Sequence, residues 1–340
     1  MPAAAFRFPV SIFRFALMKP RLLVLELWGL GDLVIATPFL RAATEKYSVT
    51  LLAKPYAQEL HPHFWPDVEV IPFSAPWTAF RDKYQLWFWP WRELFTLRRR
   101  LVAQQFDYAV SARWDPRDHL ALKLSGAKER LGFSRLKSRR YLTRELARPG
   151  PLAHRFESWR VAGAALGLEL PPREEIFTAT GALPRVVLIH TGARLPLRVW
   201  PLENFRSLAA RLRGKNFTVQ IVCDADQLGW WRARGEPAVC PPNVTGLMDS
   251  LRAAGVFIGN DSGPGHLAAA CGRPTFTVFG PQLHEWFAPL HAASEIFEGK
   301  ACPYKPCSDY CRFAEPFCLR GITVADAWPR IEAFVQKHLP

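Results

Sequence analysis

The sequence lacks the features that mark membrane-spanning, disulfide-rich and repeat proteins. No stretch offers the ~18 uninterrupted apolar residues that a membrane-spanning helix requires. Its 7 cysteines do not form the dense disulfide framework of a small secreted domain. We find no internal repeat and no low-complexity segment. These absences leave an ordinary globular protein that is held together by a packed core.

The N-terminal seventeen residues, MPAAAFRFPVSIFRFAL, do not fit a secretory signal. They lack a clean apolar core and a small-residue cleavage site, and Arg7 and Arg14 interrupt them. Met18 directly precedes a strand-like run and is a natural start. We therefore expect residues 1–19 to be an extension, either an upstream start-site artefact or a loosely ordered amphipathic arm.

The chain has the size of two domains and an excess of positive charge. Its 340 residues suit two domains of roughly 150 residues each. Hydrophobic residues make up 49% and charged residues 22%, as in globular proteins. The net charge of +14 favours anionic partners, namely nucleic acid, sugar phosphates or a membrane surface. We see no compact nucleic-acid recognition motif and expect no nucleic-acid partner.

Apolar runs alternate with helical spacing in two successive series. Strands are expected at 21–27, 49–54 and 106–112, and a new series begins with RVVLIHTGA at 185–193. Such alternation predicts an α/β protein with two Rossmann-like lobes whose parallel sheets face a central cleft. The predicted parts are a first lobe at 20–150, a linker at 151–184, a second lobe at 185–322 and a C-terminal helix at 323–340.

GNDSGPGH, at 259–266, combines a glycine bend with the start of a helix. Gly263 and Gly265 remove side chains from one turn, which allows a sharp bend or a close approach. The helix that follows would aim its free N–H groups and positive dipole end at one point, where a phosphate binds well. Ser262 belongs to the same turn, and His266 could donate to a phosphate or cap the helix. Asp261 could orient an arginine or sugar hydroxyls, or act as a cap.

HTGARLPLRVWP, at 190–201, places cations after a predicted strand. Thr191, Gly192 and Arg194 follow the strand end, and Arg198 precedes a helix opened by Pro201. The planar donors of arginine suit phosphate oxygens. If this strand end and the glycine turn are neighbours in the sheet, together they would hold a diphosphate.

The early stretch WGLGD, at 28–32, carries one carboxylate at a helix start. The third glycine of a dinucleotide-binding fingerprint is absent, and Lys54 stands where an acidic ribose ligand is expected. Asp32 is therefore either a helix cap or a general base that faces the cleft. The sequence alone leaves both readings open.

These motifs together resemble glycosyltransferase family 9, the ADP-heptose:lipopolysaccharide heptosyltransferases. The resemblance rests on NDSGPGHLAAACGRPTFTVFGP, the Trp-Pro pair at 200–201 and the early GLGDLVIATP, and it runs from about residue 20 to 335. It implies a GT-B fold, inverting transfer without an obligate metal or other cofactor, and a nucleotide held by the second lobe. It also implies that Asp32 is the catalytic base and that Arg198 replaces a lysine common in the family.

The resemblance also implies the partners. ADP-heptose would be the donor and lipopolysaccharide inner core the acceptor, at the inner face of the cytoplasmic membrane. Donor contacts would come from Thr191, Gly192, Arg194, Arg198, Asp261, Ser262, Gly263, Gly265 and His266. Another nucleotide-sugar, a protein acceptor or a non-catalytic binder at the membrane surface remain alternatives.

The first lobe is rich in arginines and tryptophans. Loop arginines, among them Arg113, Arg117, Arg139 and Arg140, are expected on the acceptor side of the cleft, where phosphates and carboxylates would complement them. Aromatic residues that include Trp77, Trp87, Trp89, Trp91 and Phe95 precede Arg98-Arg99-Arg100. That composition suits either a membrane-interface face or an ordinary hydrophobic helix face with a solvated end.

CPYKPCSDYCRFAEPFC contains four cysteines, Cys302, Cys307, Cys311 and Cys318. Four thiols could bind zinc or an iron centre, but the Cys-x2-Cys spacing of common zinc sites is missing. Packing thiols or a stress-induced disulfide are the other interpretations. We predict no catalytic metal.

Overall fold

The computed structural model describes residues 19–79, 85–179, 181–307 and 310–340, so the predicted N-terminal arm lies outside the described residues. The first lobe is built on a parallel sheet with the order β3-β2-β1-β4-β5-β6. Its strands are β1 (Arg21–Glu26), β2 (Ser48–Ala53), β3 (Glu69–Pro72), β4 (Tyr108–Ser111), β5 (Glu129–Gly132) and β6 (Arg144–Glu145). Because both faces are covered by helices, β1 and β2 are buried along almost their whole length.

The second lobe repeats the same topology. Its parallel sheet has the order β12-β11-β10-β7-β8-β9. The strands are β7 (Val186–His190), β8 (Thr218–Val222), β9 (Ala238–Val239), β10 (Val256–Asn260), β11 (Thr275–Phe279) and β12 (Ser294–Glu298). Two Rossmann-like lobes with parallel sheets are therefore confirmed. Each strand order reverses beside the first strand of its lobe, β1 or β7, where ligands bind in such sheets.

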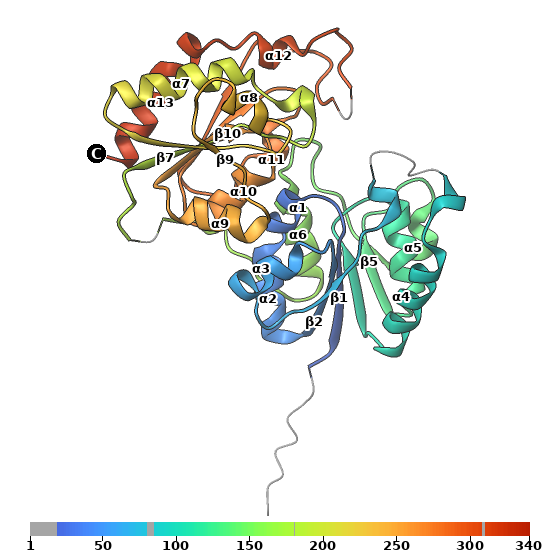
Figure 1. Cartoon of the computed structure of the whole chain (residues 1–340). Helices are drawn as coiled ribbons and strands as arrows, with labels where there is room; N and C mark the ends of the chain where they lie inside the picture. The colour runs from blue at the N-terminus through green and yellow to red at the C-terminus, as the bar shows by residue number, and fades with distance from the viewer. Residues whose placement is uncertain (1–18, 80–84, 180, 308–309) are drawn as a thin grey trace, which may run out of the picture.

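Helices connect the strands of both lobes (Figure 1). Those up to the linker are α1 (Leu30–Ile35), α2 (Thr37–Lys46), α3 (Ala57–Phe64), α4 (Trp91–Ala103), α5 (Pro116–Leu124) and α6 (Arg155–Ala165). Those of the second lobe are α7 (Leu202–Gly214), α8 (Leu228–Arg232), α9 (Val244–Arg252), α10 (Gly263–Ala270), α11 (His284–Phe287), α12 (Phe317–Arg320) and α13 (Val324–His338). Short 3-10 segments include η1 (Pro76–Thr78), η2 (Leu86–Phe88), η3 (Ser138–Tyr141), η4 (Arg173–Glu175) and η5 (Pro196–Arg198). None of the helices in the described ranges is long and apolar enough to cross a bilayer.

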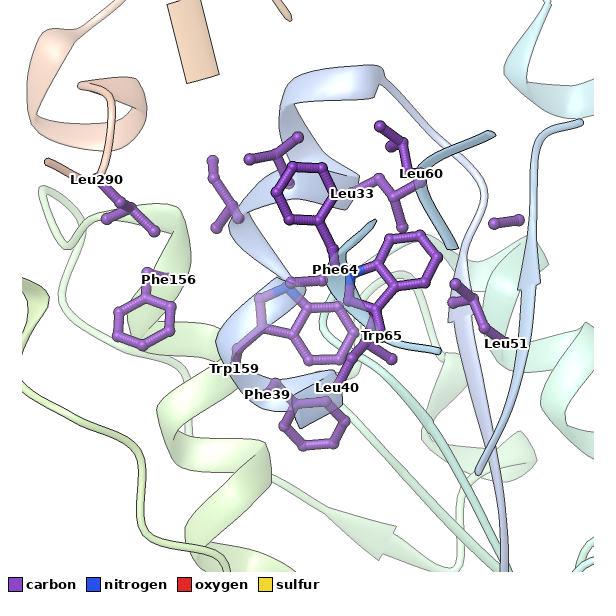
Figure 2. Close-up of a cluster of buried hydrophobic side chains, with 14 of the residues drawn as sticks. Leu33, Phe39, Leu40, Leu51, Leu60, Phe64, Trp65, Phe156, Trp159 and Leu290 are labelled. Carbon is purple, nitrogen blue, oxygen red and sulfur yellow. The ribbon is translucent and has the colours of Figure 1, made fainter. Parts of the chain in front are cut away.

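Helix α6, from the predicted linker, packs on the first lobe. Its Trp159 ring lies 4.7 Å from the ring of Phe39 on α2 (Figure 2). Phe156 belongs to the same buried cluster, which also contains Leu290 from the second lobe. A continuous apolar core therefore joins the two lobes behind the cleft.

The C-terminal helix α13 packs on the second lobe. Phe334 lies 5.6 Å from the ring of Phe276 on β11, and Glu332 forms an ion pair with Lys215 after α7 at 2.9 Å. Figure 1 shows α13 beside α7. The prediction that residues 323–340 cross back onto the first lobe is therefore wrong. The apolar face of α13 is buried by the helix and sheet of its own lobe, while α6 covers the first lobe.

Candidate functional site between the lobes

A cavity of about 1180 Å³ separates the carboxyl ends of the two sheets. Residues that follow β1, β2, β4, β7 and β10 line it, because parallel strands point their carboxyl ends to one edge. This volume exceeds the range of a site for one small ligand. The cavity can therefore hold two substrates at once.

Helices α1 and α10 meet at the edge of this cavity, and glycines permit the contact. A Cβ on Gly31 would lie 2.6 Å from Cδ2 of His266, and a Cβ on Gly263 would lie 2.9 Å from Cβ of Leu30. Gly263 was predicted to leave room for a phosphate. Its missing side chain instead makes room for the other lobe.

Gly265 also faces protein, since a Cβ there would lie 3.4 Å from the ring of Phe257. The start of α10 nevertheless borders the cavity through Ser262, Gly263 and His266. Ser262, the N-cap residue, makes no side-chain capping hydrogen bond. The dipole end of α10 thus points into the cavity, as predicted for an anion site.

Replacing Gly31 with alanine should destabilise the protein by about 1–3 kcal/mol, because the new methyl group would overlap the buried His266 ring. Gly214→Ala is the matched control, since a Cβ at Gly214 meets no atom within 4 Å. Thermal melts of both variants check the prediction. Equal melting temperatures would contradict the close approach of the two helices.

Asp32 is both a helix cap and a cleft residue. It occupies the third position of α1, where its Oδ2 accepts a hydrogen bond from the N–H of Gly29 at 3.2 Å. The same oxygen forms an ion pair with Nη2 of Arg113 at 2.6 Å. Oδ1 is buried and has no hydrogen-bond partner among the residues that the structure describes. One oxygen therefore holds the side chain in place and the other can accept a proton.

A cluster of buried charged groups surrounds Asp32, and the sequence did not reveal it. Burial, followed by the charge of Asp32, raises the pKa of Glu26 to about 8. Burial, followed by the charge of Arg113, lowers the pKa of Arg155 to about 9. Glu26 ends an otherwise apolar strand, which is the one local signal that could have found it. Arg155 belongs to the linker helix, where the sequence carries no such signal.

Asp118 of α5 anchors this cluster to two tryptophans. The Nε1 atoms of Trp28 and Trp77 each donate a hydrogen bond to its carboxylate at 2.9 Å. Burial raises the pKa of Asp118 to about 6. Trp28 in turn stacks under Arg113, whose guanidinium carbon lies 5.0 Å from the ring centroid. The position of Arg113 is therefore set by an aromatic ring as well as by Asp32.

Replacing Glu26 with glutamine should reduce the loss of stability as pH rises. The folded-state pKa of Glu26 is about 8, against 4.5 as the ordinary value, so the folded state retains a proton that the unfolded state releases. Stability from this group is complete below pH 4.5 and is lost as pH rises towards 8. The difference in melting temperature, variant minus wild type, should therefore grow by roughly 3 °C between pH 6.5 and 8. Glu157→Gln, on the surface of α6, is the control, and a flat difference for Glu26→Gln would refute the prediction.

Cations from both lobes line the cavity. Nη1 of Arg198 lies 3.4 Å from Oδ2 of Asp261, so Asp261 orients Arg198, one of the roles that the sequence suggested. Burial raises the pKa of Asp261 to about 6, against the opposing charge of Arg198. Arg194 also lines the cavity. Burial, followed by the charge of Arg194, lowers the pKa of Lys54, which follows β2 in the first lobe, to about 8.

His266 lines the cavity as a buried side chain. Burial lowers its pKa to about 4, so the imidazole is neutral at physiological pH. Its Nδ1 has no hydrogen-bond partner within the described part of the chain. A neutral imidazole can donate one hydrogen bond to a ligand oxygen.

Thr191 lies outside the cavity lining. It is fully buried, and its hydroxyl donates a hydrogen bond to Oε1 of Gln227 at 2.7 Å. A direct ligand contact, as predicted for Thr191, does not fit this position. Gly192 does line the cavity, and a Cβ there would overlap the Asp224 carboxylate. The loop after β7 is thus held by Thr191 and opens to the cavity at Gly192.

The predicted acceptor-side arginines divide into two pairs. Arg113 and Arg117 line the cavity, and Arg117 is also bound to Asp115 at 2.7 Å. Arg139 instead forms an ion pair with Glu145 at 3.1 Å, and Arg140 stacks on the Tyr141 ring at 4.9 Å. Neither of the latter two lines the cavity, because η3 turns them towards the edge of the sheet. The arginines that the sequence missed at this wall are Arg148 and Arg155.

The four C-terminal cysteines carry free thiols. No group of three or more histidine, cysteine or acidic side chains with the geometry of a metal site occurs within residues 19–79, 85–179, 181–307 and 310–340. Burial raises the pKa of Cys318, and the neighbouring cysteines add to this effect. The cysteines thus lie near one another without forming a ligand set in this arrangement.

Two lobes of Rossmann strand order that face each other across a substrate-sized cavity define the GT-B class. Residues 160–316 match the model of glycosyltransferase family 9 (heptosyltransferase), the family that the sequence motifs resemble. A lipopolysaccharide heptosyltransferase 1 from Pseudomonas aeruginosa is 27% identical over 64% of this chain and 65% of its own length, slightly under two thirds.

Solved structures agree on the fold. An E. coli ADP-heptose lipopolysaccharide heptosyltransferase II is 17% identical, with a TM-score of 0.68 over 93% of this chain and 99% of its own. An E. coli heptosyltransferase solved with ADP is 18% identical, with a TM-score of 0.71 over 92% of this chain and 99% of its own. The GT-B prediction is therefore confirmed.

Proposed function

We propose that this protein is an inverting glycosyltransferase that moves heptose from ADP-heptose to a lipopolysaccharide inner-core acceptor. The observation that carries the proposal is that Asp32, whose buried Oδ1 has no hydrogen-bond partner among the described residues, lines the same cavity as the start of α10, Arg194 and Arg198. The similar proteins include an ADP-heptose lipopolysaccharide heptosyltransferase, which supports the choice of donor and acceptor.

In this proposal Asp32 Oδ1 takes the proton from the acceptor hydroxyl. The resulting oxygen attacks the anomeric carbon from the face opposite the diphosphate, and the bond from that carbon to the diphosphate oxygen breaks. Arg113 orients Asp32 through the ion pair to Oδ2. Group transfer of this kind needs a positioned base within hydrogen-bonding reach of the hydroxyl.

ADP departs with additional negative charge, and the second lobe would stabilise it. Arg194, Arg198 and the first turn of α10 line the same cavity, and His266 can donate one further hydrogen bond. Preorganised donors of this kind act most strongly on charge that develops in the transition state. Lys54 would add a cation from the acceptor lobe when the lobes enclose the donor.

The proposed acceptor implies where in the cell the enzyme would act. Lipopolysaccharide inner core is attached to lipid, so the enzyme would work in the cytoplasm at the inner face of the cytoplasmic membrane, as a peripheral protein. Arg113, Arg117, Arg148 and Arg155 would face the phosphates and carboxylates of the acceptor.

The test is product analysis. Incubation with ADP-heptose and a truncated, heptose-free core acceptor should yield an acceptor one heptose heavier and one equivalent of ADP. A thermal-shift panel of ADP-, UDP- and GDP-sugars would identify the donor, because a ligand at about 100 times its Kd stabilises the fold by about 2.7 kcal/mol. Absence of product together with absence of any shift would refute the proposal.

A further inference from the structure

The first lobe exposes a group of large apolar side chains around the start of α4. Trp87 is 81% exposed, Phe88 72% and Phe95 62%. Leu86 and Trp91 complete this group, which we call the aromatic surface. Single exposed apolar residues are ordinary, but a contiguous set of this size marks an interaction site. Figure 1 shows α4 on the outer side of the first lobe, away from the second lobe.

Arginines border the aromatic surface. Residues 85–105 contain four arginines, Arg92, Arg98, Arg99 and Arg100, against the single acid Glu93, and Arg100 is paired with Glu69 at 3.2 Å. Trp91, Phe95 and Arg98 recur at intervals of four and three, so they lie along one stripe of α4, while Leu101 faces the core. Aromatic residues beside arginines on an exposed helix suit the headgroup region of an anionic bilayer.

The aromatic surface is continuous with the wall of the cavity. Trp91 packs on Trp89 with ring centroids 5.8 Å apart, and Trp89 packs on Trp77 at the same distance of 5.8 Å. Trp77 lines the cavity and donates to Asp118. A row of indole rings therefore leads from the exposed side chains to the first-lobe wall beside Asp32.

We propose that the aromatic surface seats the first lobe in the headgroup region of an anionic membrane. Trp87, Phe88 and Phe95 enter the interface, the arginines contact acidic lipid headgroups, and a lipid-anchored acceptor reaches the cavity along the Trp91–Trp89–Trp77 row. This last step rests on the proposed function, whereas membrane binding does not. A second copy of the chain is a poorer occupant, because two such faces would bring their arginines together in a protein with a net charge of +14.

Vesicle binding tests the surface. Wild-type protein should sediment with vesicles of phosphatidylethanolamine and phosphatidylglycerol, more weakly at high salt, and poorly with phosphatidylcholine vesicles. The triple variant Trp87→Ser/Phe88→Ser/Phe95→Ser should lose about tenfold or more in partition coefficient. Arg98→Gln/Arg99→Gln should weaken binding to the anionic vesicles alone. Tyr310→Ser removes an exposed aromatic ring from the second lobe and is the matched control, which should bind like wild type.

Activity assays separate this proposal from the proposed function. The triple variant should act on a deacylated, water-soluble acceptor at the wild-type rate but should be slowed about tenfold or more on acceptor embedded in vesicles. Undiminished vesicle binding by the triple variant, or no binding by wild type, would overturn the membrane surface. Dimerisation of wild type that the same substitutions abolish would assign the surface to a second copy instead. If wild type transfers sugar to neither acceptor, the proposed function fails while the vesicle result still decides the role of the surface.

Discussion

Replacing Asp32 with asparagine is expected to lower kcat by about a thousandfold or more, within the range that general bases contribute. The amide keeps the size of the side chain but cannot take a proton, so the acceptor hydroxyl would attack without being deprotonated. Binding of ADP should change little, because the cations proposed to hold it come mainly from the second lobe. Steady-state rates and calorimetric ADP binding on the same samples check both parts of the prediction.

Loss of helix capping must be separated from loss of the base. Asp32 accepts from the Gly29 N–H, and asparagine would accept that bond through an uncharged oxygen, so the variant also weakens a cap worth about 1 kcal/mol. Asp326→Asn is the matched control, because Asp326 holds the same third position in the capping box of α13, where it accepts from the Thr323 N–H at 2.9 Å. Asp326→Asn should lose stability without loss of rate. Near-wild-type turnover by Asp32→Asn would remove the base assignment.

Replacing Arg198 with glutamine is expected to lower kcat/KM for the donor by about a hundredfold, the scale of losing one charge-stabilising donor. The same change should weaken ADP binding and should raise the pKa of Asp261 further, since the charge of Arg198 is the largest effect that opposes burial there. Arg198→Lys should retain much of the activity, because it preserves the charge. Donor KM and the Kd of ADP are the quantities to measure.

Arg206→Gln provides the control for Arg198. Arg206 lies on α7, is half-exposed and pairs with Glu203 three residues earlier, at 3.1 Å. Its loss should leave both constants unchanged, since exposed ion pairs contribute little. If Arg198→Gln binds ADP like wild type, the diphosphate site must lie elsewhere in the cavity.

Much of the fold could be predicted because its signals are local. Buried parallel strands read as short apolar runs, so RLLVLEL and RVVLIHTGA identified β1 and β7 without knowledge of their neighbours. The alternation with helices then implied a Rossmann-like lobe on each side of a linker. The position of α13 could not be predicted from local signals. Its apolar stripe is compatible with any complementary apolar face, and in the structure it packs in one cluster with residues of α7.

Site residues that follow strand ends were the easiest to anticipate. Asp32, Arg198 and Asp261 each follow a strand end or open a helix beside one, and all three border the cavity. Gly263 was correctly predicted to lack a side chain so that another group can approach closely. The group that approaches is Leu30 of the first lobe and not the predicted phosphate. No local pattern shows that Gly263 would meet Leu30, which is more than two hundred residues away in the sequence.

The sequence by itself determined the strands, the two lobes and the chemical groups available at the strand ends, because these depend on hydrophobic periodicity and on turn residues within short windows. Only the tertiary structure decided which of those groups share one cavity. Burial beside Asp32 raises the pKa of Glu26. Thr191 is buried and hydrogen-bonds to Gln227, so it supports its loop instead of contacting a ligand. Arg139 pairs with Glu145 and does not line the cavity. Such outcomes depend on distances between segments far apart in the chain, and the free energy of a buried charge is set by those distances rather than by its sequence neighbours.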